Sequence, residues 1–288
     1  DSPFAGREGK YLTSRHLRER LWKEAQTNVS LKVAETDSPD AFQISGRGEL
    51  HLSILIETMR REGYELQISK PEPITKLVDG KLLEPYERLF ILVPEAASGP
   101  IIENLGQRRA ELINMAPSGS NLNLEYLIPA RGLIGFRSQF LTDTKGEGVM
   151  HHLFDSYGLW KDGIGQHRQG SLVAFEDGDA TAYGIHNVED RGVLFVVPGE
   201  KIYTGMVIGI HHKDDDLDIN VCKKKHLTNM RSSNADEAIR LVPPLRFSLE
   251  QAMEFIAEDE LVEVTPQTIR MRKKVLDRTT RARLRKKP

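Results

Sequence analysis

The sequence has very little cysteine, since Cys222 is the only one among 288 residues. A single thiol excludes an internal disulfide and a zinc site built from several thiolates, so we expect a buried thiol. No apolar run approaches the roughly 18 residues that a membrane span needs, and the first residues, DSPFAGREGK, lack the apolar core of a signal peptide. These absences predict a soluble, cytoplasmic, monomeric chain with no membrane partner.

Motifs of catalysis are also missing. The stretch GREGKYLTS resembles a phosphate-binding loop, but Phe4 stands where that motif needs glycine and Tyr11 where it needs a hydroxyl on serine or threonine. The stretch GRGELH lacks the third glycine of a dinucleotide-binding loop, and the chain has no nucleophile elbow or calcium loop. We therefore expect no catalytic, nucleotide-binding or metal-binding residues in this chain.

Charge is unevenly distributed along the chain, although its formal total is only −2. Residues 270–288 contain ten Lys or Arg and one acid, Asp277, which gives this end +9 and leaves −11 for residues 1–269. A basic end on an acidic body is typical of an arm that binds a polyanion. The alternative is a solvated, disordered end that only improves solubility.

Hydrophobic periodicity predicts an α+β protein. In residues 1–70, helical spacing in SRHLRERLWKEAQT and GELHLSILIETMRRE, with alternation in VSLKVAE, AFQIS and YELQISK, gives the order α-β-β-α-β. The common split arrangement is β-α-β-β-α-β. We therefore expect a ferredoxin-like module without its first strand, as in a chain cut from a longer one.

Residues 86–165, which follow a linker over 71–85, repeat this order in full. Strands are expected at 87–94, 121–129 and 149–160, and helices at 99–113 and 131–144. The first of these helices would carry Ile101, Leu105 and Leu112 on one side. This pattern predicts a second ferredoxin-like βαββαβ module.

Residues 166–288 change in texture to short β-rich runs separated by Gly, Asp and Pro. Strands are expected at 171–176, 180–188, 192–198, 206–212 and 260–274. One helix is expected at 248–259, where Ser248 and Gln251 form a capping-box pattern. The pattern predicts a mainly β C-terminal domain with a helix and a basic tail.

The stretch HHKDDDLDINVCKKKHLTNMRSS, residues 211–233, concentrates charge of both signs. Its first half offers possible metal ligands, namely His211, His212, Asp214, Asp215, Asp216 and Asp218. Adjacent residues of a strand point to opposite faces, so the two histidines would not reach one ion. A metal-dependent hydrolase stays open as an alternative, beside an acidic surface turn.

The second half of this stretch favours RNA. Lysines in a loop that cannot bury itself neutralise phosphates and release counterions. We expect RNA contacts from this loop and from the basic end, at Lys223, Lys224, Lys225, His226, Asn229, Arg231, Arg270, Arg272, Lys273 and Lys274. The alternatives are a solvated loop and a protein-interaction scaffold whose basic tail binds acidic proteins.

Four long segments resemble the BipA family, also called TypA, of bacterial translational GTPases. They are SPFAGREGKYLTSRHLRERL, DAFQISGRGELHLSILIETMRREGYELQISKPEPI, PARGLIGFRSQFLTDTKGEG and HHKDDDLDINVCKKKHLTNMRSSNADEAIRLVPP. The resemblance implies modules similar to the third and fifth domains of elongation factor G, followed by a BipA-specific domain. It also implies that GTP and magnesium bind a preceding domain, outside this chain.

The resemblance further implies a partner and a role. Members of the family bind the ribosome at the factor site, close to ribosomal proteins there, and the last domain reaches ribosomal RNA and the acceptor end of A-site tRNA. They are linked to large-subunit assembly and to stress or cold adaptation. The loop at Lys223 to Ser233 would correspond to the RNA-contacting loop of the family.

Overall fold

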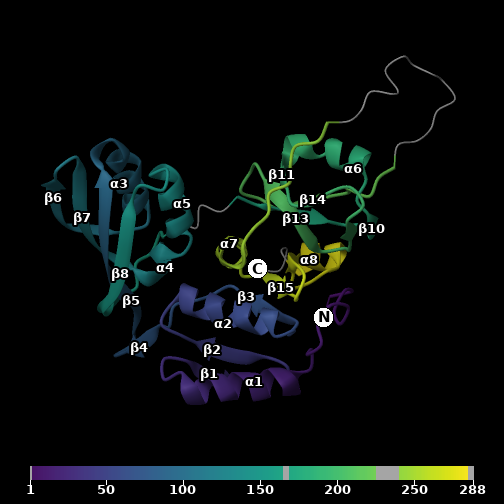
Figure 1. Ribbon diagram of the computed structural model, residues 1–288, viewed down its shortest axis with the longest axis horizontal. Helices are drawn as coiled ribbons and strands as arrows, with labels where there is room; N and C mark the ends of the chain where they lie inside the picture. The colour runs from purple at the N-terminus through teal and green to yellow at the C-terminus, as the bar shows by residue number, and fades with distance from the viewer. Residues whose placement is uncertain (1, 165–168, 225–239, 285–288) are drawn as a thin grey trace. The chain divides into compact units, whose positions relative to one another are not determined.

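The computed structural model describes residues 2–164, 169–224 and 240–284 (Figure 1). The chain divides into two compact units. Unit 1 combines Asp1–Lys70 with Arg168–Pro288, and unit 2 is Pro71–His167. The architecture is α+β in both units, as the hydrophobic patterns predict.

Unit 2 contains a five-stranded antiparallel sheet, four of whose strands are neighbours in the order β6, β7, β5 and β8. Its elements are β4 (Lys76–Val78), β5 (Lys81–Pro94), η1 (Glu95–Ala97), α3 (Ser98–Gln107), β6 (Glu111–Ser118), β7 (Asn121–Pro129), α4 (Ala130–Leu133), α5 (Phe136–Asp143) and β8 (Val149–Leu159). β4 forms a short hairpin with the start of β5. From β5 onward the order is the β-α-β-β-α-β of a ferredoxin-like fold.

The core of unit 2 lies between this sheet and its helices. Alternate residues of β5, among them Leu89 and Ile91, are buried against Ile101 and Leu105 of α3 and against the phenylalanines of α5. Every second residue of β5 and residues four apart on α3 therefore pack together in one apolar layer. This layer fixes the helices on one face of the sheet.

Two expectations about unit 2 are wrong in detail. The helix predicted at 99–113 ends at Gln107, because Arg109 adopts a left-handed conformation with φ of 61°. Leu112 consequently lies in β6 and is exposed rather than on the apolar side of a helix. The helix predicted at 131–144 is divided into α4 and α5 at Gly135, whose φ is 71°.

Unit 1 is built around a seven-stranded sheet. Its path runs β14, β9, β13, β16, β15 and β3, and β11 pairs with β13 beside this path. The strands are β3 (Leu66–Ser69), β9 (Ser171–Ala174), β11 (Gly192–Leu194), β13 (Met206–His211), β14 (Leu217–Ile219), β15 (Glu260–Val264) and β16 (Ile269–Lys273). Two short pairs complete the unit, β1 (Lys32–Glu35) with β2 (Phe42–Ser45) and β10 (Gly178–Asp179) with β12 (Lys201–Ile202).

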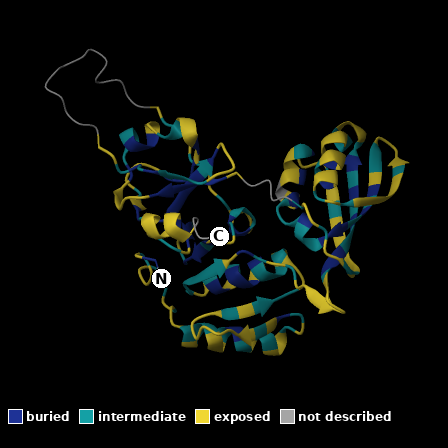
Figure 2. Cartoon of the chain, turned by 180° about the vertical axis from the view of Figure 1, so that it is seen from behind, coloured by how far each residue is buried: buried dark blue, intermediate teal, exposed yellow. Residues whose placement is uncertain are grey.

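The helices of unit 1 are α1 (Ser14–Thr27), α2 (Glu49–Arg61), α6 (Ala182–His186), η2 (Glu189–Arg191), α7 (Leu249–Phe255) and α8 (Arg278–Leu284). The predicted capping box of α7 is confirmed, because Ser248 and Gln251 each bind the backbone N–H of the other. Figure 2 shows the outer side of α1 exposed and the central strands of the large sheet buried. Helix α1 buries Leu21 toward α2 and the β1–β2 pair.

The strand β3 differs from the arrangement expected for residues 1–70. It pairs antiparallel with β15, with Ile68 opposite Val262, whereas β1 and β2 pair with each other. Leu66 contacts both the α1–α2 core and the core beneath β15, so apolar packing supports this long-range pairing. The strands expected to form one sheet within residues 1–70 are therefore divided. β1 and β2 form a pair of their own, and β3 joins the large sheet of unit 1.

A second difference lies at residues 180–188, which were expected to form a strand. The structure has the helix α6 there, because the hydroxyl of Thr181 accepts a hydrogen bond from the Gly184 N–H and caps its start. Apolar and polar residues alternate around Tyr183 as they do in a strand. The hydrogen bond of the Thr181 cap nevertheless favours the helix. Unit 1 thus has three α-helices and the 3₁₀ helix η2, not one helix, within the described residues after 168.

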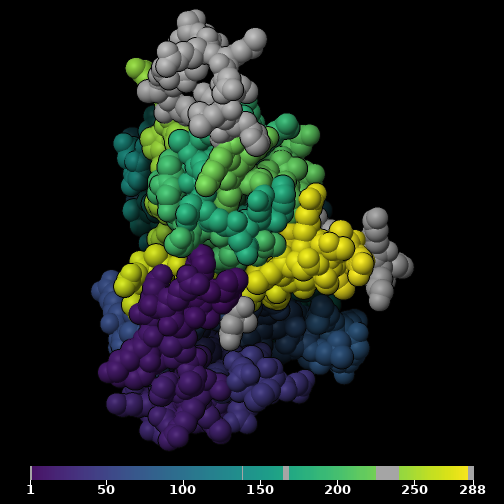
Figure 3. Space-filling view, turned by 90° about the vertical axis from the view of Figure 1, so that its right-hand side faces the viewer, coloured from purple at the N-terminus to yellow at the C-terminus, as the bar shows by residue number. Residues whose placement is uncertain are grey.

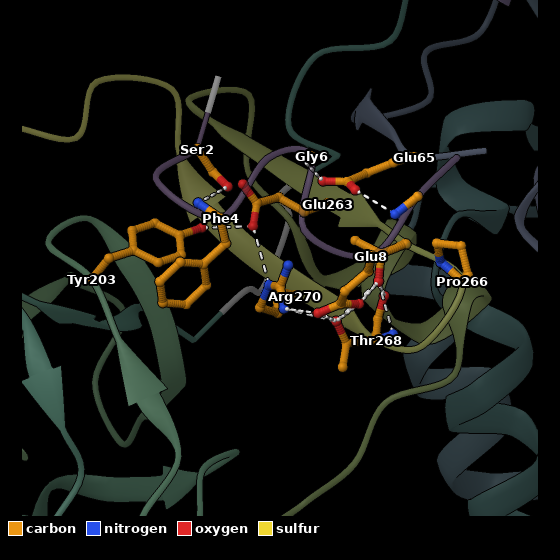
Figure 4. Close-up of polar contacts among 12 residues, drawn as sticks. Ser2, Phe4, Gly6, Glu8, Glu65, Tyr203, Glu263, Pro266, Thr268 and Arg270 are labelled. Carbon is orange, nitrogen blue, oxygen red and sulfur yellow. Dashed lines mark hydrogen bonds and ion pairs between the residues drawn. The ribbon is translucent and has the colours of Figure 1, made fainter. Parts of the chain in front are cut away.

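The N-terminal loop lies beside the C-terminal strands of unit 1 (Figure 3). The ring of Phe4 meets Tyr203 edge-on at 5.0 Å between centroids. The carboxylate of Glu8 accepts hydrogen bonds from Thr268 at 3.0 Å and from Arg270 at 3.1 Å (Figure 4). These contacts hold the first residues of the chain on β15 and β16.

Candidate nucleic-acid interface

Lys223 and Lys224 follow β14 and are exposed. The hydroxyl of Thr181 donates a hydrogen bond to the backbone carbonyl of Lys223 at 2.6 Å, which ties the chain to the start of α6. Both lysines line a groove together with Phe175, Glu176, Asp177, Gly178, Asp179, Thr181, Asn220 and Cys222. The other predicted residues of this loop, Lys225, His226, Asn229 and Arg231, lie outside the described residues.

The strand β14, which leads into these lysines, is held by ion pairs. Asp216 accepts a hydrogen bond from the Ser171 backbone at 2.9 Å and from the amino group of Lys273 at 2.6 Å. Asp218 is bound by Arg281 at 2.7 Å and by Arg278 at 3.1 Å. Asp216 and Asp218 therefore bind cations of the C-terminal segment, and their carboxylates are not directed toward a metal ion.

Three of the residues predicted to contact RNA are largely withdrawn from solvent, since Arg272 and Lys273 are buried and Arg270 is half-buried. Arg270 and Arg272 lie on one face of β16 and form ion pairs with Glu263 at 3.4 and 3.2 Å. Lys273 lies on the opposite face, where only 1% of its side chain is exposed. Burial opposes the charge of Lys273, but Glu260 and Asp216 outweigh it and raise its pKa. Cations neutralised in this way do not reach a phosphate.

Lys274 is exposed, and of the four residues predicted in the basic end it alone presents its side chain to solvent. Arg278 and Arg283, which belong to the basic end expected to bind a polyanion, are also exposed. The guanidinium of Arg278 lies 5.1 Å from the ring centre of Phe175, at the groove beside the two lysines. Strand alternation would not have identified Arg278 and Arg283, because both lie in the helix α8.

The two histidines of the stretch at 211–218 do not converge. His211 is buried, and its Nδ1 lies 2.6 Å from the carbonyl of Asp215, whereas His212 is exposed. Among residues 2–164, 169–224 and 240–284, no three His, Cys, Asp or Glu side chains are placed to share a metal ion. The structure offers the metal-dependent alternative no ligand set in the described part of the chain.

The glycine-rich loop at the N-terminus binds a carboxylate from its own chain. Glu65 accepts hydrogen bonds from the backbone N–H of Gly6 at 3.0 Å and of Gly9 at 2.9 Å (Figure 4). These amides would be the donors to a bound phosphate. Glu65 thus occupies the position that an external anion would need.

Cys222 is half-buried in the groove beside Lys223. Burial, and after it the charges of Glu176 and Asp179, raise the pKa of its thiol. A thiol with a raised pKa stays protonated at neutral pH and is a poor nucleophile. The arrangement of this groove therefore favours charge recognition over covalent chemistry.

No helix in the described ranges is long and apolar enough to cross a membrane. The family model described as TypA/BipA C-terminal domain matches residues 169–278, and the one described as Elongation factor G C-terminus matches residues 81–167. The latter range lies in the ferredoxin-like unit 2, and the former contains the groove with Lys223 and Lys224.

Curated relatives match along the whole chain and carry the name Large ribosomal subunit assembly factor BipA. The protein of Bacillus subtilis (strain 168) is 51% identical over 100% of this chain and 47% of its own length. That of Synechocystis sp. is 53% identical over 95% of this chain and 46% of its own length. That of Escherichia coli (strain K12) is 49% identical over 100% of this chain and 48% of its own length. The chain thus spans about half the length of these relatives.

Proposed function

Because the chain belongs to the TypA/BipA family through its matched domains, we propose that it is the ribosome-binding part of a translational GTPase. The name of its relatives, large ribosomal subunit assembly factor, supports a role in assembly of the large subunit. The proposed ligands are ribosomal RNA and the acceptor region of A-site tRNA. GTP and magnesium are proposed to act in the part of the relatives that this chain does not span.

The observation that carries this proposal is the exposure of Lys223 and Lys224 in the segment after β14, which the hydrogen bond from Thr181 to the Lys223 carbonyl anchors. These two side chains are part of neither a hydrophobic core nor a metal cluster among the described residues. Lysines fixed at their backbone and free at their amino groups neutralise phosphates without reading sequence. Recognition then rests on shape and charge, and no covalent bond changes.

Cosedimentation of the chain with purified large ribosomal subunits across a salt titration tests this proposal. The double variant Lys223→Ala/Lys224→Ala removes up to two phosphate contacts, so the log-log salt slope should become shallower by about 1.5. The matched control is Lys32→Ala/Lys81→Ala, which makes the same change in net charge at two exposed lysines elsewhere. Equal binding by both double variants at every salt concentration would refute the role of the loop.

A further inference from the structure

Trp160 lies directly after β8 in unit 2 with 38% of its surface exposed. The guanidinium carbon of Arg131 lies 3.7 Å from the centre of its ring system. The indole Nε1 donates a hydrogen bond to Asp162 at 3.2 Å. One large aromatic side chain is therefore held in a fixed orientation while much of it faces solvent.

Arg131 is itself fixed by a carboxylate with no solvent exposure. Its Nε lies 2.5 Å and its Nη2 3.0 Å from the two oxygens of Glu84. Glu84 is fully buried and also accepts a hydrogen bond from the Lys161 N–H at 2.8 Å. Paired in this bidentate way, the guanidinium keeps its plane against the indole. The charge of Arg131 is neutralised by Glu84, so we regard Arg131 as a rigid support for Trp160 and not as a ligand-binding cation.

A pocket opens next to this pair. Its lining consists of Gly106, Arg109, Ala110, Glu111, Lys161 and Asp162. Arg109 and Lys161 supply positive charge, but Lys161 forms an ion pair with Glu111 and Asp162 adds a second negative group. Positive and negative charges are therefore balanced, and attraction to a polyanion is weak here. The feature that distinguishes the pocket is the exposed aromatic ring beside it.

We propose that Trp160 stacks an unpaired RNA base. The identity of the ligand as RNA rests on the proposed function, whereas the site itself rests on the Arg131–Trp160 geometry. A supported, exposed indole accepts any base, because every base has a π-face. This site would add contact energy that depends little on salt, in contrast to Lys223 and Lys224 in unit 1.

The chain contains only two tryptophans, Trp22 and Trp160, which makes a direct test possible. In the full chain carrying Trp22→Phe, all tryptophan emission comes from Trp160. Titration with a single-stranded RNA about ten nucleotides long should quench this emission, saturably and in parallel with the RNA anisotropy. The control is Trp160→Phe, in which Trp22 on α1 packs against Phe42 and should not respond.

Two further titrants identify the ligand. A perfect RNA duplex has no unpaired base and should bind without quenching, and a mononucleotide should quench only weakly. Quenching by the duplex equal to that by the single strand would overturn stacking as the mechanism. Quenching by the mononucleotide as strong as that by RNA would assign the site to a free nucleotide and overturn the proposal.

Substitution gives an independent measurement of affinity. Trp160→Ala should weaken binding of the single strand about 5- to 100-fold while leaving the slope of affinity against salt unchanged. Circular dichroism confirms that the variant is folded, and the fluorescence test does not depend on it. RNA that binds the chain without changing Trp160 emission would overturn this inference and leave the lysine-based function standing. A chain that binds no RNA in either measurement would overturn both.

Discussion

The amino group of Lys273 lies 2.9 Å from the carboxylate of Glu260, and neither side chain is exposed beyond 1%. Asp216 and Asp259 bind the same amino group at 2.6 and 2.9 Å. This buried cluster links three parts of unit 1: β16, the turn before β15 and the stretch before β14. Lys273 belongs to the basic end at residues 270–288. The cluster therefore places this residue in the interior of unit 1 and not in a solvated arm.

Replacement of Lys273 by methionine should therefore destabilise unit 1. Removal of the cation leaves buried carboxylates uncompensated, which lowers the free energy of unfolding by about 3 to 5 kcal/mol. Urea denaturation followed by circular dichroism measures the change. Lys274→Met is the matched control, because the side chain of Lys274 is exposed and should contribute little to the free energy of unfolding. Similar losses in both variants would contradict the assignment of Lys273 as a buried anchor.

Stability should also depend on pH through Glu49 at the start of α2. Burial, together with Glu254 and Glu250, raises the pKa of Glu49 from 4.5 to about 7. Between these values the folded chain keeps a proton that the unfolded chain has lost, so this group lowers stability as the pH rises. Glu49→Gln should therefore raise the free energy of unfolding by about 1 to 2 kcal/mol at a pH above 7, and hardly at all below 4.5.

The control for this measurement is Glu258→Gln, which changes an exposed carboxylate in the same unit. Chemical denaturation at several pH values compares the two variants with the parent. A Glu49→Gln effect of equal size at acidic and alkaline pH would show that the gain comes from another cause than proton binding.

The contact of Glu8 with Arg270 has the opposite dependence on pH. Burial works against the charged form of Glu8, but hydrogen bonds from Thr265 and Arg270 outweigh it and lower its pKa below 4.5. Its contribution is thus fully present above 4.5 and is lost as the pH falls through the lower pKa of the folded state. At neutral pH, Glu8→Gln should lower the free energy of unfolding by about 1 to 2 kcal/mol.

Limited trypsin digestion gives a local measurement of the same contact. Cleavage after Arg7 should be faster in Glu8→Gln, because the loop that holds Phe4 on Tyr203 is then released more often. Asp37→Asn, an exposed change elsewhere in unit 1, should leave this rate unchanged. An unchanged rate in both variants would show that Glu8 does not restrain the loop.

Local patterns located several helices, but they missed α6 and α8, merged α4 with α5 and extended α3 too far. The spacing of Leu17 and Leu21 places α1 correctly, and the Ser248 cap places the start of α7, because both signals act within one turn. The pairing of β3 with β15 depends on residues far away in sequence, which no local period reveals. The failed strand at 180–188 shows the same limit, since the cap at Thr181 overrides the alternation.

The residues proposed to contact RNA show a comparable division. The exposure of Lys223 and Lys224 agrees with the composition of their loop, which has little to bury. The ion pairs of Arg270, Arg272 and Lys273 could not be read from composition, because their partners come from other segments of the chain. A basic run indicates charge, and only the packing decides whether that charge is available.

The pairing of Ile68 with Val262 also has a consequence for biosynthesis. After β3 leaves the exit tunnel, about 190 further residues must be translated before its partner strand leaves the tunnel as well. Unit 2 comes between them and carries its own core, so it can fold during this interval. During this interval, the strand β3 has no partner strand for its backbone hydrogen bonds. A chaperone that binds this exposed strand edge would protect the nascent chain from aggregation.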